Sequence, residues 1–259
     1  MLNIMYATNE TQCVELAYSI ISLLKHNKNV HIFLCTNSDG INPFSEKSIK
    51  WLQGVVKYMD SESFLEQIEI KDIYNEELKG NPNENCRITR NALTRLLADK
   101  IFLPKGINNI LYCDPDVMFA TNIISLLRKI QNENIALKPF GNDLCDGVTY
   151  FNITNLQQFN FFELIRKEIK SDKLFREDQT AIENVIRRNQ IPYYAFNNEE
   201  VYMNALYKKN FTPIMYHFAG EIPFPVGCVS EEKFVELMPE FSYVKDLLDN
   251  YRSSIRFNF

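Results

Sequence analysis

Short apolar runs and amphipathic segments follow one another through the first 72 residues. The apolar runs at 3–7, 30–35 and 67–72 have the length and composition of strands. Between them, residues 14–24 and 45–59 carry apolar side chains three and four positions apart, which is the spacing of an amphipathic helix. This order of strands and helices predicts an α/β protein whose mostly parallel, Rossmann-like sheet is flanked by helices.

The rest of the chain is less regular. The polar segment 74–86 predicts a loop, and the second half predicts an irregular C-terminal elaboration that includes the apolar segment 213–220. The further predicted elements are a helix at 89–102, strands at 109–113 and 135–139, and helices near 158–170 and 177–189. Neither an internal repeat nor a low-complexity linker divides the sequence, so we expect one domain over residues 1–259.

Composition and charge narrow the class of protein. A hydrophobic fraction of 46% and a charged fraction of 24% are typical of a soluble globular chain. The net charge of −5 gives no general attraction to nucleic acid or to an anionic membrane. No apolar run approaches the roughly 20 residues that span a bilayer, and no signal peptide is evident. We therefore expect a cytoplasmic protein with no nucleic-acid partner and no integral membrane segment.

The six cysteines fit the same compartment, because none of them forms a CxxC pair. Their scatter favours free thiols over a zinc ribbon or a disulfide framework. They are Cys13, Cys35, Cys86, Cys113, Cys145 and Cys228.

The strand predicted at 109–113 runs directly into Asp114-Pro115-Asp116. Ligands of open α/β sheets bind beyond the carboxyl ends of the strands, and residues two apart on an extended segment face the same side. Pro115 biases Asp114 toward that extended geometry. Two carboxylates so placed suit Mg²⁺ or Mn²⁺ bridging to a phosphate. The alternative is a simple turn, since Asp-Pro-Asp is also common turn chemistry.

Four sequence blocks, taken in their order along the chain, favour the metal site over the simple turn. They are LNIMYATNE from residue 2, ITRNALTRLLADKIFLP from residue 88 with NNILYCDPDVMF from residue 108, EDQTAIENVI from residue 177 and MYHFAG from residue 215. Together they resemble glycosyltransferase family 8, which contains bacterial lipopolysaccharide galactosyltransferases and glycogenin. The resemblance extends over most of residues 2–220. It implies a GT-A type fold and retaining transfer of a sugar from a nucleotide sugar, usually UDP-linked, with a divalent metal that is commonly Mn²⁺.

The resemblance also implies the metal ligands. Asp114 and Asp116 match the Asp-X-Asp of the family, with Asp116 as the more direct ligand. His217 matches a third ligand, whose imidazole favours a transition metal over Ca²⁺. We therefore expect Mn²⁺, or Mg²⁺, at these three residues. The alternative for His217 is a structural histidine within an aromatic segment.

Donor contacts follow from the same comparison. Arg95 matches a helix arginine that binds the donor, and its guanidinium suits either phosphate or the carboxylate of Asp114. The alternative is a surface arginine, because Arg87 and Arg90 lie close by in the sequence. Gly220 would let the backbone approach the diphosphate closely. The full expected donor set is Ala7, Thr8, Asn9, Arg95, Asp114, Asp146, Gly147 and Gly220.

Asp178 and Gln179 match positions beside the reactive carbon of the sugar. A carboxylate there stabilises oxocarbenium character, by analogy with retaining glycosidases. We expect these two residues to be catalytic. The alternative is that Asp178 only favours the N-terminus of the helix predicted at 177–189.

The chain departs from the family pattern at four positions. Asn9 replaces an acidic residue that contacts uracil, and Gln12 replaces an aromatic residue that stacks on the base. Pro223 replaces a lysine that contacts the diphosphate, which costs the leaving group one cation. The lysines that could replace it are Lys138, Lys208, Lys209 and Lys233.

The fourth departure is Asp146, which stands where a small neutral residue is usual. A carboxylate there would accept hydrogen bonds from sugar hydroxyls and repel an acidic sugar, which predicts a neutral donor such as UDP-glucose. The alternative is that Asp146 pairs with a nearby lysine or arginine and does not meet substrate.

The function we predict is metal-dependent retaining transfer of a hexose from a donor of the UDP-glucose or UDP-galactose type. Residues 1–140 would form the nucleotide-sugar and metal half, and 141–259 the half that binds a glycan or glycosylated-protein acceptor. A possible homodimer is one further expected partner. The alternatives are a donor-binding protein with little turnover, which Gln12 and Pro223 favour, and a self-glucosylating protein like glycogenin. A nucleotidyltransferase is disfavoured because ATNETQ has neither glycine nor a basic residue.

Overall fold

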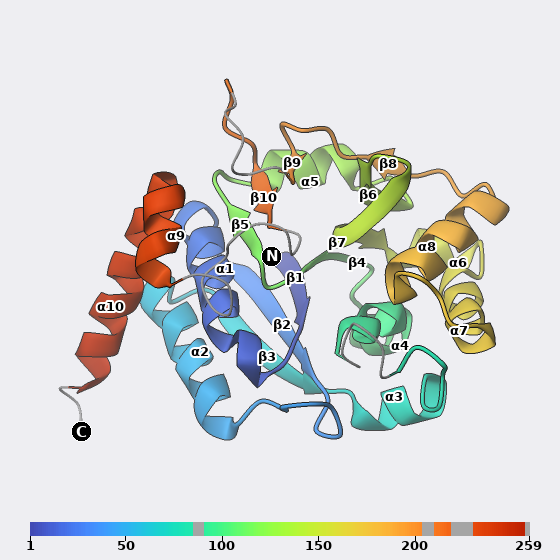
Figure 1. Ribbon diagram of the computed structural model, residues 1–259, viewed down its shortest axis with the longest axis horizontal. Coiled ribbons are helices and arrows are strands. Elements are labelled where there is room, and N and C mark those ends of the chain that lie inside the picture. Colours follow the sequence, from blue (N-terminus) through green and yellow to red (C-terminus); the bar gives the residue numbers. More distant parts are fainter. Residues whose placement is uncertain (85–90, 204–209, 219–229, 257–259) are drawn as a thin grey trace.

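A mixed seven-stranded sheet forms the centre of the molecule (Figure 1). The computed structural model describes residues 1–84, 91–203, 210–218 and 230–256. The strand order is β3-β2-β1-β4-β7-β6-β8, in which the first four strands are parallel and β7 runs antiparallel to β4. The strands are β1 Leu2–Ala7, β2 Val30–Thr36, β3 Phe64–Glu69, β4 Asn109–Cys113, β6 Ile135–Phe140, β7 Asp143–Asn152 and β8 Tyr194–Ala195. The predicted α/β class with a mostly parallel sheet is confirmed.

Helices cover both faces of this sheet, and each face has its own hydrophobic core (Figure 1). One core contains residues of α1 Cys13–His26, α2 Glu46–Met59, α5 Ile124–Ile130, α9 Glu231–Leu237 and α10 Ser242–Arg256. The other contains residues of α3 Lys71–Glu77, η2 Ala92–Leu97, α4 Ala98–Phe102, α6 Ile153–Gln157, α7 Phe161–Ser171 and α8 Glu177–Arg188. Short 3₁₀ turns are η1 Glu10–Gln12, η3 Leu103–Lys105 and η4 Pro239–Phe241. Within the described residues, no helix is both long and apolar enough to cross a membrane.

A second, three-stranded sheet brings the C-terminal part of the chain to the end of β4. Its order is β5-β10-β9, formed by β5 Val117–Phe119, β10 Met215–His217 and β9 Val201–Tyr202. Strand β10 runs antiparallel to β5, with His217 opposite Val117. Since Val117 follows Asp116 directly, this pairing carries His217 to the Asp-Pro-Asp segment.

Strand β7 is irregular where it passes this segment. Ala136 of β6 pairs with Tyr150 of β7, but Lys138 pairs with Cys145, so two residues along β6 correspond to five along β7. A bulge of this kind re-aims side chains and is frequent next to active sites. The extra residues include Asp146 and Gly147.

Two predicted elements are wrong in their bounds. The strand expected at 67–72 is β3, which begins at Phe64 and ends at Glu69, and the loop expected at 74–86 begins inside a helix, α3. The reason is that Ile70, Tyr74 and Leu78 recur four residues apart and are all fully buried in the second core. Their helical spacing lies within a polar segment, which hid it.

One predicted helix is divided. In place of one helix at 89–102, the described part of this segment holds η2 and α4, which meet at Leu97 with φ −107° and ψ 12°. The helix predicted near 158–170 is confirmed as α7, which begins after Asn160 in the left-handed region at φ 51°; the short helix α6 precedes it and was not predicted. The helices predicted at 45–59 and 177–189 and the strands at 109–113 and 135–139 are confirmed.

Candidate functional site

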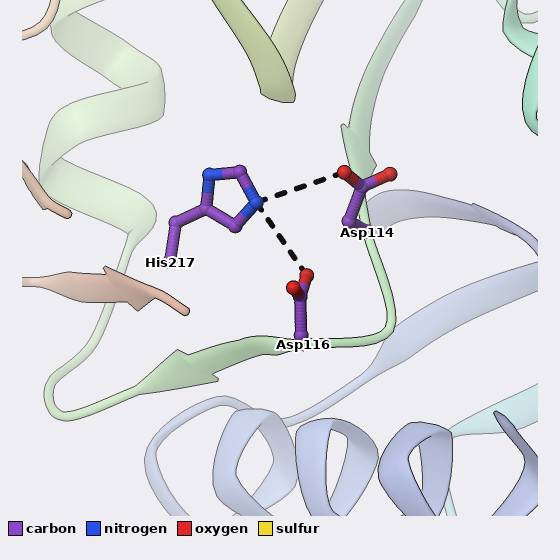
Figure 2. Close-up of side chains that lie close together, drawn as sticks. All are labelled: Asp114, Asp116 and His217. Carbon is purple, nitrogen blue, oxygen red and sulfur yellow. Dashed lines mark ion pairs between the residues drawn. The ribbon is translucent and has the colours of Figure 1, made fainter. Parts of the chain in front are cut away.

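Two carboxylates and an imidazole converge just beyond the end of β4 (Figure 2). One oxygen each from Asp114 and Asp116 and one ring nitrogen of His217 lie within 4.8 Å of one another. His217 Nε2 is 3.6 Å from Asp114 Oδ2 and 3.5 Å from Asp116 Oδ1. The Asp-Pro-Asp segment also forms the turn of the alternative interpretation, because the Val117 amide donates to the Asp114 carbonyl at 3.2 Å. That turn presents both carboxylates to His217.

The backbone fixes His217 in this position. Besides the pairing of β10 with β5, the Phe218 amide donates to the Asp116 carbonyl at 3.1 Å. The His217 side chain is therefore delivered on a hydrogen-bonded strand, and only 4% of the residue is exposed. A buried polar ring held on a strand has little freedom to turn away from the carboxylates.

Gly147 of β7 makes room for the three side chains. Its carbonyl accepts from the Asp114 amide at 2.7 Å, which holds the two backbones together. A Cβ at position 147 would lie 2.1 Å from His217 Cε1, 2.4 Å from His217 Nε2 and 2.6 Å from Asp114 Oδ2. Any other residue would thus occupy the space between these side chains. Glycine is required here for access and not for a special backbone conformation.

The donor set fits a divalent metal of the Mn²⁺ or Mg²⁺ type. Asp116 Oδ1 is buried and has no hydrogen-bond partner, and the basic group that meets it among the described residues is His217 Nε2 at 3.5 Å, so this oxygen has little compensation for its burial. A cation held by this oxygen, Asp114 Oδ2 and His217 Nε2 would supply that compensation. Two carboxylate oxygens with one imidazole suit a first-row transition ion better than Ca²⁺.

A second cluster adjoins the first through Asp114. Arg95 of η2 is 4% exposed and directs each guanidinium nitrogen to a different acid. Its Nη2 lies 2.9 Å from Asp114 Oδ1, Nη1 lies 3.2 Å from Asp146 Oδ2, and Nε lies 3.0 Å from Asp178 Oδ2. The guanidinium carbon also lies 4.0 Å from the centre of the Tyr112 ring. The structure therefore brings three of the predicted site residues together around a fourth, Arg95.

One cation does not balance three buried acids equally. Burial raises the pKa of Asp178, Asp146 raises it further, and Arg95 only partly opposes them, so it lies well above its ordinary range. Burial likewise raises the pKa of Asp146. Burial also opposes ionisation of Asp114, but Arg95 and His217 outweigh it and hold the Asp114 pKa below its ordinary value. Asp114 is thus the acid that stays ionised most readily, as a metal ligand requires.

The end of β1 and the loop after it present Ala7, Thr8 and Asn9, all of which are buried. Asn9 Oδ1 accepts from the Thr11 amide at 3.1 Å and from the Thr11 hydroxyl at 2.5 Å, which caps η1. Its amide nitrogen has no partner within the described part of the chain. The Thr8 hydroxyl donates to Gln12 Oε1, so Thr8 and Gln12 hold each other in place.

Several site side chains were not foreseen from the sequence. Asn91 donates to the Thr8 carbonyl at 2.6 Å and so ties the segment before Arg95 to the loop after β1. Burial, together with the charge of Asp116, raises the pKa of Glu15 to about 7. No local pattern marks these residues, because each acts on a segment distant in sequence. The unforeseen residues are Glu15, Asn91, Tyr112 and Cys145.

The remaining predicted residues are less closely tied to the site. Gln179 follows Asp178 in the first turn of α8 and is half-buried. Lys138 donates to the Phe196 carbonyl at 3.2 Å and to Asn198 Oδ1 at 2.7 Å, and Lys233 pairs with Glu236 at 2.7 Å, so both ammonium groups are engaged. Residues outside the described part are Arg87, Arg90, Lys208, Lys209, Gly220 and Pro223.

The sequence of the chain matches a known protein family. The sequence model of glycosyl transferase family 8 matches residues 3–139, which is more than half of the chain. A search of curated proteins found no sequence match.

Solved structures share the fold at low sequence identity. The bifunctional glycosyltransferase WbbM is 14% identical with a TM-score of 0.70, over 96% of this chain and 51% of WbbM. GlyE of Streptococcus pneumoniae TIGR4 is 12% identical with a TM-score of 0.68, over 98% of this chain and 63% of GlyE. The galactosyltransferase LgtC is 13% identical with a TM-score of 0.66, over 93% of this chain and 96% of LgtC. The chain thus spans about half of WbbM and nearly all of LgtC.

Proposed function

The chain belongs to glycosyl transferase family 8 and is a glycosyltransferase with a GT-A type fold; on that premise we propose the reaction it carries out. It transfers a hexose from a nucleotide sugar, of the UDP-glucose or UDP-galactose type, to a glycan or a protein-linked sugar, with retention and with Mn²⁺ or Mg²⁺. The observation that supports this most directly is the convergence of Asp114, Asp116 and His217 within 4.8 Å. A cytoplasmic location and a homodimer remain predictions.

The geometry divides the work of Asp114 between its two oxygens. Oδ1 accepts hydrogen bonds from Arg95 at 2.9 Å and from the Tyr112 hydroxyl at 2.5 Å. Oδ2 is the oxygen that faces His217. With Oδ1 held in this way, the carboxylate cannot rotate freely, so Oδ2 is oriented toward the metal position before any ligand arrives.

A metal bound by Asp114 Oδ2, Asp116 Oδ1 and His217 Nε2 would act as a Lewis acid on the departing diphosphate. Arg95 keeps Asp114, Asp146 and Asp178 together at the edge of this position. Asp178, in its ionised form, would stabilise positive charge on the sugar carbon, as a carboxylate does in retaining glycosidases. Ala7, Thr8 and Asn9 would contact the base, with the amide nitrogen of Asn9 as a donor to a pyrimidine oxygen.

The names of the similar structures support sugar transfer but not one sugar. LgtC is described as a galactosyltransferase solved with donor and acceptor sugar analogues, and a mouse protein of similar fold as a xyloside xylosyltransferase. Our preference for a neutral hexose rests on Asp146, whose carboxylate would repel an acidic sugar. Its contact with Arg95 also supports the alternative in which it does not touch substrate, so the donor must be measured.

A panel of nucleotide sugars tested by thermal shift, with and without Mn²⁺, identifies the donor. A ligand at 100 times its Kd stabilises the folded state by about 2.7 kcal/mol, which is a readily measured rise in Tm. We expect one neutral UDP-hexose to raise the Tm with Mn²⁺ and not with EDTA, and Asp116→Asn to remove the rise. A Tm that no nucleotide sugar changes would contradict the proposal.

Donor hydrolysis separates the proposed enzyme from a donor-binding protein with little turnover. The second candidate is favoured by Pro223, which stands where the family has a diphosphate-binding lysine. Release of UDP from the identified donor without acceptor, lost in Asp178→Asn, supports the transferase. Donor binding with no release of UDP, under any metal, supports the binding protein.

A further inference from the structure

A cysteine thiol that has no assigned role lies beside the metal triad, which is the group formed by Asp114, Asp116 and His217. Cys145 of β7 is 8% exposed, and its Sγ is 3.5 Å from Nδ1 of His217. The other ring nitrogen, Nε2, faces Asp114 and Asp116 (Figure 2). The imidazole is therefore held with sulfur at one nitrogen and the carboxylates at the other.

The position of the proton on an imidazole decides which of its two nitrogens can bind a metal. A neutral histidine can offer Nε2 as a ligand only when its proton is on Nδ1. That Nδ1–H then needs an acceptor, and a buried ring cannot take one from bulk water. In the described part of the chain the Cys145 sulfur is the group that meets Nδ1. Metal-binding histidines depend on such partners, which are more often a carboxylate or a carbonyl.

The backbone keeps the thiol in place independently of the metal. Cys145 pairs with Lys138 across the β6–β7 ladder, immediately before the bulge that contains Gly147. Gly147 lies beside Cε1 and Nε2 of the same ring, because any Cβ at this position would clash with these two atoms. Two positions of one strand thus determine where the ring lies: Gly147 leaves space for it, and Cys145 supplies the hydrogen-bond partner. The Lys138 ammonium, the nearest cation on β6, is already bound to Phe196 and Asn198.

We propose that Cys145 is a positioning residue that accepts the Nδ1 proton of His217 and thereby aims Nε2 at the divalent cation. The proposal rests on the metal-dependent function above. It assigns the affinity of the site for metal partly to a side chain that does not touch the metal. Loss of an outer partner of this kind typically weakens a metal site by about 10- to 100-fold.

Mn²⁺ binding to the full chain, followed by the electron paramagnetic resonance signal of the free ion, tests this directly. After EDTA treatment and dialysis, Cys145→Ala should raise the Mn²⁺ Kd by at least about 10-fold. Cys145→Ser, which retains an acceptor, should recover most of the affinity. Cys35→Ala is the matched control, because Cys35 is a fully buried cysteine on β2, a strand that β1 and β4 separate from β7. Its Kd should equal that of the wild type.

The ring ¹⁵N resonances of the metal-free protein give a readout that a merely structural role would not change. The chain has three histidines, so these signals can be assigned by substitution. At a pH high enough for the His217 ring to be neutral, we expect it to carry its proton on Nδ1 in the wild type and in Cys145→Ser, and to shift toward the Nε2–H form in Cys145→Ala. Cys145→Ala with wild-type Mn²⁺ affinity, or Cys145→Ser as weak as Cys145→Ala, overturns the proposal. A wild type that binds no Mn²⁺ overturns the metal-dependent function itself, and the role of Cys145 with it.

Discussion

Arg95 is one buried cation that serves three carboxylates. An arginine that is 4% exposed is stable in a protein interior only when paired, and here each of its three nitrogens faces a different acid. The acids outnumber the cation, so at least one of them is ionised at a cost to the fold. Asp178, with a pKa raised by burial and by Asp146, bears most of that cost.

Asp178→Asn should therefore stabilise the metal-free protein while reducing activity. An acid with a raised pKa in the folded state favours folding below its unfolded pKa, and this contribution is lost as the pH rises through the folded value. The asparagine variant has no such loss. Its advantage in unfolding free energy should thus grow as the pH rises above about 4, the ordinary pKa of an aspartate in the unfolded chain.

Urea unfolding in EDTA at several pH values measures that advantage. Asp172→Asn, at an exposed aspartate, is the control and should show no comparable change with pH. An Asp178→Asn protein that is less stable than wild type at neutral pH would mean that the ion pair with Arg95 outweighs the cost of burial.

Substitution of Gly147 should remove the metal site and leave the fold intact. In Gly147→Ala the new methyl group must displace His217 or Asp114, because it would lie 2.1 Å and 2.6 Å from their atoms. These are side-chain ends, so they can move without unfolding the sheet. We expect the Mn²⁺ Kd to rise by about 100-fold or more, measured by titration calorimetry.

Gly80→Ala is the matched control for this substitution. A Cβ at Gly80 would meet nothing within 4 Å, but the residue has φ 76°, which is unfavourable for alanine. It should cost about 1 kcal/mol of stability and leave metal affinity unchanged. Unchanged Mn²⁺ binding in Gly147→Ala would show that the ions bind elsewhere.

At the scale of elements, Arg166 of α7 joins three helical segments. Its Nη1 is 2.6 Å from Asp99 of α4, and its Nε is 3.2 Å from Glu77 of α3. The same Nη1 donates to the Leu96 carbonyl of η2 at 3.1 Å. Because η2 also carries Arg95, this contact supports the element that organises the acids of the site.

Arg166→Gln should destabilise the protein by about 3 kcal/mol, since it leaves the partly buried Asp99 without its cation, whereas Glu77 keeps Lys100 at 2.7 Å. The shift of the urea midpoint measures it. Arg128→Gln, on the exposed face of α5 with no ion pair among the described residues, should change the midpoint little. Equal midpoints for the two variants would show that the acids are satisfied without Arg166.

Elements that bury a continuous apolar face were predictable from the sequence, whereas α3 was not. The strands at 109–113 and 135–139 bury nearly every residue, so local composition was enough. Helix α3 is short and polar, and it is held by the burial of Ile70, Tyr74 and Leu78 in the second core. Such a helix draws its stability from tertiary packing, which the local pattern does not contain.

The same distinction applies to the site. Asp114 and Asp116 were predictable as a pair because the spacing that aims them is local. The three partners of Arg95 come from β4, β7 and α8, and the contact of Cys145 with His217 joins residues 72 positions apart. The resemblance to a family supplied the residue list, and the pairing of Asp146 with an arginine was the alternative interpretation, but the sequence did not identify Arg95 as that arginine.

At the scale of the molecule, the triad joins distant parts of the chain. His217 lies about 100 residues after Asp114 and Asp116, and it reaches them through β10 of the second sheet. Closing a loop of that length costs entropy before any contact is gained, so pairings of this kind tend to form late in folding.

This order of events has a kinetic consequence. Interactions that are absent from the folding transition state slow unfolding and leave the folding rate almost unchanged. In stopped-flow experiments, saturating Mn²⁺ should therefore lower the unfolding rate, while the refolding rate equals that in EDTA. Faster refolding with Mn²⁺ would instead place the triad in the transition state. A metal bound in this way determines how long each folded molecule survives, and the time that a new chain needs to fold is set by the chain alone.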